Sequence, residues 1–317
     1  MECCGKQIWT NLTKESLGRL VIERPDEGIR RAVKANWDAI AKPLDGMGRF
    51  EEMTAQIGAI TGDERLDLSK KAVLIFCADN GIVAEGVSQT GQEVTFAVAK
   101  SMAWNASSVG RMARFAGADT IPVDIGINSD LKIDGVMDKK IVHGTRDFLI
   151  EPAMSEEETL RAIETGIALA AECKDKGYRI LATGEMGIGN TTTSSAVAAA
   201  LLGCKSALVV GRGAGLSDAG LARKQEVVES AIKKYKLYEA DAFTVLRTVG
   251  GLDIAGLAGM CIGGALYHIP IVLDGVISMA AALAADRIVP GVREYVLASH
   301  KGKEPAVELL TGALGIH

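Results

Sequence analysis

One acidic residue lies inside a glycine-rich stretch that runs from Gly184 to Thr193 and reads Gly-Glu-Met-Gly-Ile-Gly-Asn-Thr-Thr-Thr. Its glycines allow a tight turn and let the backbone approach a ligand closely. The Asn-Thr-Thr-Thr run offers N-cap side chains and free backbone N–H groups, which stabilise an anion at a helix start. With Glu185 as the carboxylate, the stretch indicates a phosphorylated substrate whose chemistry needs an acid. A well-capped turn without function is the alternative interpretation.

The neighbouring residues predict what positions this stretch. The apolar run from Tyr178 to Ala182 is typical of a buried strand, and the alanine-rich run from Ser194 to Leu202 is typical of a helix. The glycines therefore fall at a strand-to-helix turn. We expect Gly187, Gly189, Asn190 and Thr191 to approach a bound phosphate there.

A second glycine-rich turn, Gly211 to Asp218, follows a strand predicted at 207–210 and precedes a helix predicted at 218–234. Its spacing is GxGxG, and the GxGxxG of dinucleotide-binding folds is absent, which disfavours a nucleotide-dependent dehydrogenase. Lys224, in the second turn of the helix, can reach a phosphate at this loop as a point charge. A solvated helix face is the alternative for this lysine.

Further polar residues follow other apolar runs. The strand predicted at 71–78 ends in Asp79-Asn80-Gly81, and a polar loop containing Ser88 comes next, as a binding loop or an ordinary surface turn. Asp253 lies in a third glycine turn before a buried helix. Asp274 follows a strand predicted at 269–273, where it could cap the helix at 276–285 or bind a ribose hydroxyl.

The remaining pattern sets the fold class. Amphipathic helices are expected within 17–40, a strand at 120–125, an irregular connection at 130–151 and a helix at 154–172. Ser155 and Glu158 form a capping-box pattern at the start of that last helix. Strand, polar loop and helix alternate at least five times. This alternation predicts a doubly wound, mostly parallel sheet with helices on both faces, whose last clear strand is 269–273.

Composition excludes several classes of protein. The chain has 317 residues and a net charge of −5 without a basic stripe, which argues against nucleic-acid binding. Four histidines without metal-ligand spacing make a zinc site improbable. The uncharged run 254–273 contains four glycines, a histidine and a proline, so a buried helix followed by a strand explains it better than a membrane span. No signal peptide is evident, and we expect a cytoplasmic protein. The six cysteines are expected to be free thiols: Cys3, Cys4, Cys77, Cys173, Cys204 and Cys261.

Taken together, these motifs resemble the nicotinate-nucleotide–dimethylbenzimidazole phosphoribosyltransferase family of cobalamin biosynthesis. The resemblance covers most of the chain in the right order, and the Gly-Glu-Met-Gly-Ile-Gly-Asn-Thr-Thr string is its most specific part. The other matching segments are Lys42-Pro43-Leu44, Ala78 to Gly81, Glu85 to Ser88, Gly211 to Asp218, Gly251 to Gly256, Leu273 to Ser278 and Ser299-His300.

The resemblance implies a reaction. The ribose phosphate of nicotinate mononucleotide is transferred to 5,6-dimethylbenzimidazole, with inversion at the anomeric carbon, giving α-ribazole 5′-phosphate and nicotinate. It also implies a role for each site residue: Glu185 as a supporting carboxylate, and as substrate-binding residues Ser88, Gly187, Gly189, Asn190, Thr191, Gly211, Gly213, Lys224, Asp253 and Asp274. No cofactor and no metal are expected.

The family is dimeric, so the resemblance implies a homodimer. It also implies a large α/β domain at 66–290 and a small helical domain formed by 1–65 together with 291–317. Three features depart from the family. Asn80 stands where many members have a histidine, and Gln89-Thr90-Gly91 stands where many have an aromatic-proline turn. No Gly-Glu-Gly motif, which carries the family's proton acceptor, follows Leu310. By spacing that glutamate would lie beyond His317, so the C-terminal part is expected to be truncated. A protein that binds nucleotide or base without turnover is therefore the alternative.

Overall fold

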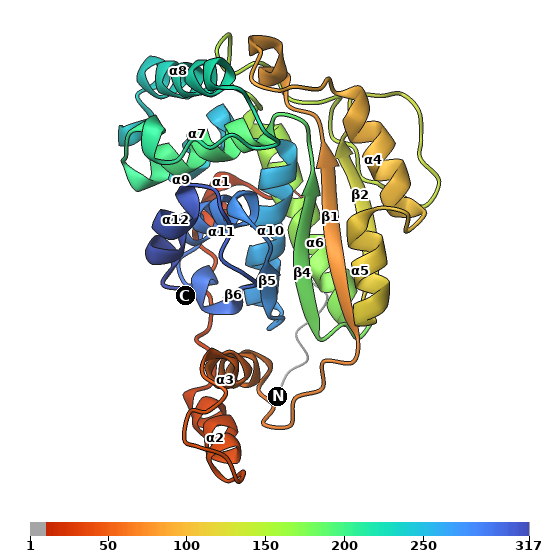
Figure 1. The fold of residues 1–317 in the computed structure, drawn as a ribbon, viewed down its shortest axis with the longest axis vertical. Coiled ribbons are helices and arrows are strands. Elements are labelled where there is room, and N and C mark those ends of the chain that lie inside the picture. The colour runs from red at the N-terminus through yellow and green to blue at the C-terminus, as the bar shows by residue number, and fades with distance from the viewer. Residues whose placement is uncertain (1–10, 317) are drawn as a thin grey trace.

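The computed structural model describes residues 11–316, which are built around a six-stranded sheet (Figure 1). All neighbouring strands run parallel, in the order β3-β2-β1-β4-β5-β6. This confirms the predicted doubly wound, mostly parallel sheet. The strands are β1 (Lys71–Ala78), β2 (Asp119–Gly126), β3 (Met137–Asp138), β4 (Ile180–Met186), β5 (Ile271–Leu273) and β6 (Val296–Ala298).

Strand β1 lies at the centre because its side chains are apolar on both faces. Leu74 and Phe76 belong to the larger core, and Ile75 and Cys77 to a smaller core on the opposite face. The chain leaves β1 toward β2 on one side and returns to β4 on the other. The carboxyl ends of β1 and β4 therefore form the switch point at which open α/β sheets bind ligands.

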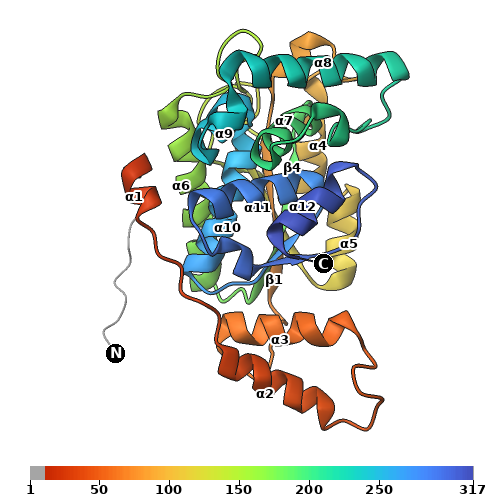
Figure 2. The same cartoon turned by 90° about the vertical axis from the view of Figure 1, so that its left-hand side faces the viewer.

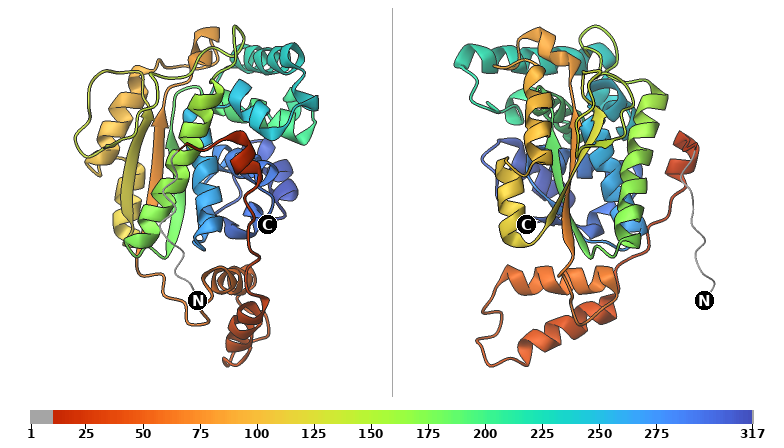
Figure 3. Two further views of the ribbon diagram at one scale, coloured as in Figure 1. Left: turned by 180° about the vertical axis from the view of Figure 1, so that it is seen from behind. Right: turned by 90° about the vertical axis from the view of Figure 1, so that its right-hand side faces the viewer.

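Helices cover both faces of the sheet, as predicted. Helices α4 and α5 lie on one face, and α6 and α10 lie on the other (Figure 3). The helices are α1 (Lys14–Gly18), α2 (Glu27–Asp38), α3 (Arg49–Thr61), α4 (Glu93–Ala103), α5 (Ser108–Ala116), α6 (Glu156–Asp175), α7 (Asn190–Leu202), α8 (Asp218–Tyr235), α9 (Ala242–Val249), α10 (Leu252–Leu266), α11 (Val276–Ile288) and α12 (Ala306–Leu314), with short 3₁₀ turns η1 (Gly81–Glu85), η2 (Ser206–Leu208), η3 (Leu237–Glu239) and η4 (Val292–Tyr295).

Helices α6 and α10 touch through glycine. A methyl group at Gly166 would overlap the carbonyl oxygen of Gly256, and one at Gly259 would overlap that of Ile163. Residues 252–265 of α10 are all buried, which accounts for the long uncharged run without a membrane. Among residues 11–316, every helix is too short or too polar to cross a bilayer.

Helices α2 and α3 pair at the end of the molecule away from the carboxyl ends of the strands (Figure 2). Glu51 is 1% exposed, and its carboxylate pairs with the ammonium groups of Lys34, at 2.9 Å, and Lys42, at 2.8 Å. These ion pairs hold the Lys42-Pro43-Leu44 turn against α3. Helix α12 packs against α7 and α11. The division into domains at residues 65 and 290 stays a prediction.

Three predicted elements near the glycine loops are wrong in kind or extent. Residues 207–210 form no strand, because the N–H groups of Val209 and Val210 both bond to the carbonyl of Ser206 and close a turn instead. Strand β4 continues to Met186, so Glu185 lies in the strand and not in the turn. Helix α7 starts at Asn190, four residues earlier than predicted, and its N-cap is Gly189 without a side-chain bond.

Elsewhere the differences are smaller. The helical region predicted at 17–40 is interrupted between α1 and α2, where Pro25 lies in extended chain. Strands β3 and β6 were not predicted, since two and three residues are too few to give a period. The capping box of Ser155 and Glu158 is confirmed. Cys77, Cys173, Cys204 and Cys261 are free thiols, whereas Cys3 and Cys4 lie outside the described residues.

Candidate active site

Two carboxylates meet at the carboxyl end of β4. Glu185 pairs in register with Phe76 of β1, and Asp253 lies in the first turn of α10. The side-chain amide of Asn190 donates a hydrogen bond to each, and its Nδ2–Oδ2 distance to Asp253 is 3.0 Å. One amide at the start of α7 therefore ties together two acids that are 68 residues apart in sequence.

Burial shifts the pKa of both acids upward. Burial in the protein, together with the nearby charges of Asp253 and Asp274, raises the pKa of Glu185 to about 7. Burial raises the pKa of Asp253 to about 6, against the opposing hydrogen bonds from Asn190 and the Ile254 N–H. Glu185 is half-buried, so a ligand can reach it. Near neutral pH this carboxylate can therefore either carry charge or accept a proton.

The turn between β4 and α7 is only three residues long. A methyl group at Gly187 would lie 2.7 Å from Asp253 Oδ2, and Gly189 has a φ of +94°, so both positions favour glycine. The Ile188 N–H donates to Thr95 Oγ1 at 3.1 Å, and the Asn80 side-chain amide donates to the Ile188 carbonyl at 3.4 Å. The second and third threonines of the Asn-Thr-Thr-Thr run are buried in α7 and do not cap it.

A buried ammonium group lies beside this turn. Lys224 is 0% exposed, and its Nζ donates to Thr191 Oγ1 at 2.8 Å and to the Gly211 carbonyl at 3.2 Å. Burial lowers the pKa of Lys224 to about 8, against the opposing charge of Glu304. A methyl group at Gly213 would lie 2.9 Å from Thr191 Oγ1. The second glycine loop, the lysine and the start of α7 thus form one cationic site.

Glu304 also reaches this cationic site, which the sequence did not predict. A methyl group at Gly211 would overlap Oε2 of Glu304, so the carboxylate presses directly against the glycine loop. Glu304 lies 93 residues from Gly211, in a polar segment with no recognisable motif. Only the chain path from β6 to α12 brings the two together.

Asp274 lies at the end of β5 and is exposed. Its N–H donates to Thr183 Oγ1 at 2.9 Å, and its carbonyl accepts from Ser299 Oγ at 3.1 Å. The alternative that Asp274 caps the following helix is wrong, because the N-cap of α11 is Gly275. The charge of the Asp274 carboxylate contributes to the raised pKa of Glu185, and the carboxylate can bind a ligand in the site.

Ser88 lies in the loop that follows η1. Its Oγ accepts a hydrogen bond from the Thr90 N–H, within the loop, at 3.3 Å. The loop itself reaches the second glycine loop, because Gln89 Nε2 donates to the Gly215 carbonyl at 2.8 Å. At the base of the site, the Asn80 side chain is buried, and its Oδ1 lacks a hydrogen-bond partner among the described residues.

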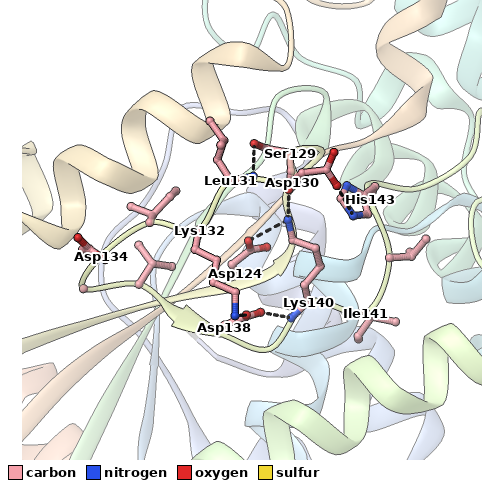
Figure 4. A pocket seen from close by; sticks show the side chains of 14 residues that line it. Asp124, Ser129, Asp130, Leu131, Lys132, Asp134, Asp138, Lys140, Ile141 and His143 are labelled. Carbon is pink, nitrogen blue, oxygen red and sulfur yellow. Dashed lines mark hydrogen bonds and ion pairs between the residues drawn. The ribbon is translucent and has the colours of Figure 1, made fainter.

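A separate polar cavity of about 540 Å³ lies beside β2 and β3 (Figure 4). Two ion pairs lie in its wall: Lys140 pairs with Asp124 at 3.3 Å, and Lys132 pairs with Asp138 at 3.0 Å, while Asp130 and Asp134 also line it. None of the predicted site residues lines it. We therefore place the candidate active site at β4, α7 and the second glycine loop.

Comparison with known proteins identifies the family. A family model described as phosphoribosyltransferase matches residues 22–317. A Clostridium tetani protein named nicotinate-nucleotide–dimethylbenzimidazole phosphoribosyltransferase is 40% identical over 98% of this chain and 85% of its own length. A protein of the same name from Acetivibrio thermocellus is 43% identical over 96% of this chain and 85% of its own length. The crystal structure of CobT from Thermus thermophilus superimposes with a TM-score of 0.87 at 33% identity, over 92% of this chain and 87% of that one. The chain therefore belongs to the phosphoribosyltransferase family.

Proposed function

We propose that this chain transfers the ribose phosphate of nicotinate mononucleotide to 5,6-dimethylbenzimidazole, giving α-ribazole 5′-phosphate and nicotinate. The names of its relatives support this reaction. The observation that carries it for this chain lies in α7. Asn190 binds the two acids, and its neighbour Thr191 binds the buried ammonium of Lys224. Two consecutive residues of α7 therefore hold the cation for the phosphate and the carboxylates for the sugar.

In this proposal Lys224, Thr191 and the loop at Gly211 and Gly213 hold the phosphate. The positive end of the α7 dipole, which follows the turn of Gly187 and Gly189, adds to the attraction for an anion. Fixing the phosphate positions the anomeric carbon for attack by the base.

The carboxylates act on the sugar. Asp253 and Asp274 bind the ribose hydroxyls, and Glu185 stabilises the positive charge that develops as the bond from the anomeric carbon to the pyridine nitrogen breaks. The bonding electrons pass to nicotinate, whose ring nitrogen becomes neutral. A benzimidazole nitrogen, held in a pocket that Ser88 lines, attacks the opposite face of the sugar. The proton on the second benzimidazole nitrogen leaves to a base, and Glu185 with its pKa of about 7 can accept it.

The test is to incubate the purified chain with both substrates and separate the products by chromatography. Equal amounts of nicotinate and α-ribazole 5′-phosphate are expected, and omitting the base should stop nicotinate release. Glu185→Gln keeps the shape of the side chain and should slow turnover. If both substrates bind and no nicotinate appears, the chain is a binding protein without turnover. The comparisons give that alternative no support.

We propose in addition that the chain forms a homodimer and works in the cytoplasm. An incompletely covered face of the sheet supports the first part. The cavity of about 880 Å³ that contains Glu185 and Asp274 is also lined by α5, where Met112 is 72% and Phe115 97% exposed, so an apolar surface lies beside the site. Sedimentation equilibrium should give twice the chain mass, and Phe115→Lys should lower it. A monomeric wild-type chain would contradict the proposal.

A further inference from the structure

Two adjacent residues of α8 contact two different parts of the proposed site. Lys224 turns inward to Thr191 and Gly211. Arg223 contacts the last residue of η1: its Nε donates to the Glu85 carbonyl at 3.2 Å, and its guanidinium also bonds the Glu85 carboxylate. We call this the Arg223–Glu85 bridge. It joins the helix that holds the phosphate cation to the segment that leads into the Ser88 loop.

A second contact joins the same two regions. Gln89, directly after Ser88, donates to the carbonyl of Gly215 at 2.8 Å. Gly215 belongs to the glycine loop that begins at Gly211, beside Lys224. The Ser88 loop is therefore attached to the proposed phosphate site at both of its ends, near Glu85 and at Gln89. Between these points its hydrogen bonds are local.

The other end of η1 cannot move freely. The Gly81 N–H donates to Thr145 Oγ1 at 3.1 Å, and a methyl group at Gly81 would overlap the backbone of residues 145–147. Glu85 also faces Asp147, and burial together with Glu85 raises the pKa of the Asp147 carboxyl. Lys234 acts on Asp147 with the opposite sign. Without its arginine, the Glu85 carboxylate would lose the cation that holds it while still facing the acid Asp147.

We propose that Arg223 is a positioning residue that couples phosphate binding to base binding, a role that rests on the proposed function. A phosphate bound at Lys224 fixes the glycine loop and the start of α8. Through the Arg223–Glu85 bridge and the Gln89 contact, this holds the Ser88 loop in the conformation that accepts the base. By thermodynamic reciprocity, the base strengthens nucleotide binding by the same factor.

The test measures coupling without turnover. 5,6-Dimethylbenzimidazole is titrated calorimetrically into the protein alone and into protein saturated with ribose 5-phosphate, which carries no leaving group. The wild-type affinity for the base should rise about fivefold with the sugar phosphate. In Arg223→Ala this gain should vanish, while the affinity for ribose 5-phosphate itself stays unchanged because Lys224 remains. Lys233→Ala removes another cation of α8, which pairs with Glu229 of the same helix at 3.3 Å, and it should behave as wild type.

Further variants separate coupling from damage to the fold. Glu85→Gln should lose the same gain as Arg223→Ala, and the double variant should lose no more than either one. In steady-state assays Arg223→Ala should raise KM for the base and leave kcat unchanged. A mere loss of fold stability would lower the melting temperature without this split.

Two results would overturn the proposal. One is a wild-type affinity for the base that is the same with and without ribose 5-phosphate. The other is an Arg223→Ala variant in which ribose 5-phosphate raises the affinity for the base as much as in the wild type. If Arg223→Ala does not fold, Glu85→Gln decides on the same criteria. Failure of the proposed function gives a different result, namely no nicotinate release by the wild-type chain from both substrates. The calorimetric coupling is measured without turnover, so it tests the bridge in either case.

Discussion

Replacing Lys224 by methionine should weaken nucleotide binding, and it should stabilise the empty protein at neutral pH. The lysine is 0% exposed, and its hydrogen-bond partners among residues 11–316 are two neutral groups, Thr191 Oγ1 and the Gly211 carbonyl. Methionine keeps most of the length of the side chain and removes the charge. The two effects have opposite signs, so a general defect in folding cannot imitate them.

The magnitude follows from the pKa. A fall from 10.5 to about 8 on folding corresponds to about 3 kcal/mol of unfavourable free energy when the amine is protonated in both states. Losing the hydrogen bonds to Thr191 and Gly211 costs about 1 kcal/mol each in the variant. The variant should therefore be more stable than wild type by about 1 kcal/mol at pH 7.

The sign of this difference should reverse with pH. Above pH 8 the folded wild type releases the Lys224 proton, while the unfolded chain keeps it up to about pH 10.5. Since the unfolded state then binds more protons, wild-type stability rises with pH relative to the variant. The two stabilities should cross at about pH 9, and the wild type should be the more stable protein at pH 10.

Urea unfolding at pH 7 and pH 10 measures the reversal, and calorimetry with nicotinate mononucleotide alone measures binding. Wild-type nucleotide affinity should fall about tenfold from pH 7 to pH 9 as Lys224 loses its proton. The variant should bind about ten- to a hundredfold more weakly at pH 7, with little dependence on pH. Lys233→Met, on the exposed side of α8, is the matched control. Equal loss of stability at both pH values, or unchanged nucleotide affinity, would refute the reasoning.

Three further predictions follow from the described contacts. Glu185→Gln should lower kcat about a hundredfold or more at an unchanged melting temperature. Wild-type kcat should rise between pH 6 and pH 8 as Glu185 ionises around its pKa of about 7. A kcat that does not change over this pH range would show that Glu185 is not the essential carboxylate. Ser155→Ala removes the cap that pairs with Glu158 and should cost about 1 kcal/mol in urea unfolding. Gly166→Ala should cost about 1–3 kcal/mol, because its methyl group would push α6 away from the Gly256 backbone; an unchanged stability would mean that the helices separate freely.

Local patterns predicted the elements that are specified by local interactions. The residues of β1 could be named because an apolar run ends abruptly in Asp79, and the start of α6 because Ser155 and Glu158 satisfy each other across one turn. The strand expected at 207–210 is wrong although the structure that replaces it is local. Its short apolar run suits either a strand or a buried turn, and here the N–H groups of Val209 and Val210 bond to the carbonyl of Ser206, three and four residues earlier, and close a turn.

The candidate site shows the same division. Glu185 and Lys224 could be singled out because each lies beside a glycine loop. Their exact settings depend on distant groups: Asn190 links Glu185 to Asp253, and Glu304 reaches Gly211 from near the end of the chain. The partner of Arg223 is Glu85, 138 residues earlier in the sequence. No periodicity or motif reports a contact at that separation, so these residues required the fold.

The adjacency of Asn190 and Thr191 has a consequence for substrate selection. Consecutive Cα atoms are about 3.8 Å apart and cannot change that spacing. Helix α7 is buried along residues 192–200, so it resists sliding or turning. The helix therefore fixes the distance between the two acids, which Asn190 holds, and the ammonium group, which Thr191 holds. A sugar monophosphate must match this fixed distance. A ligand with a longer spacer between its phosphate and its reacting carbon cannot contact both the ammonium group and the acids, even if the surrounding loops are flexible.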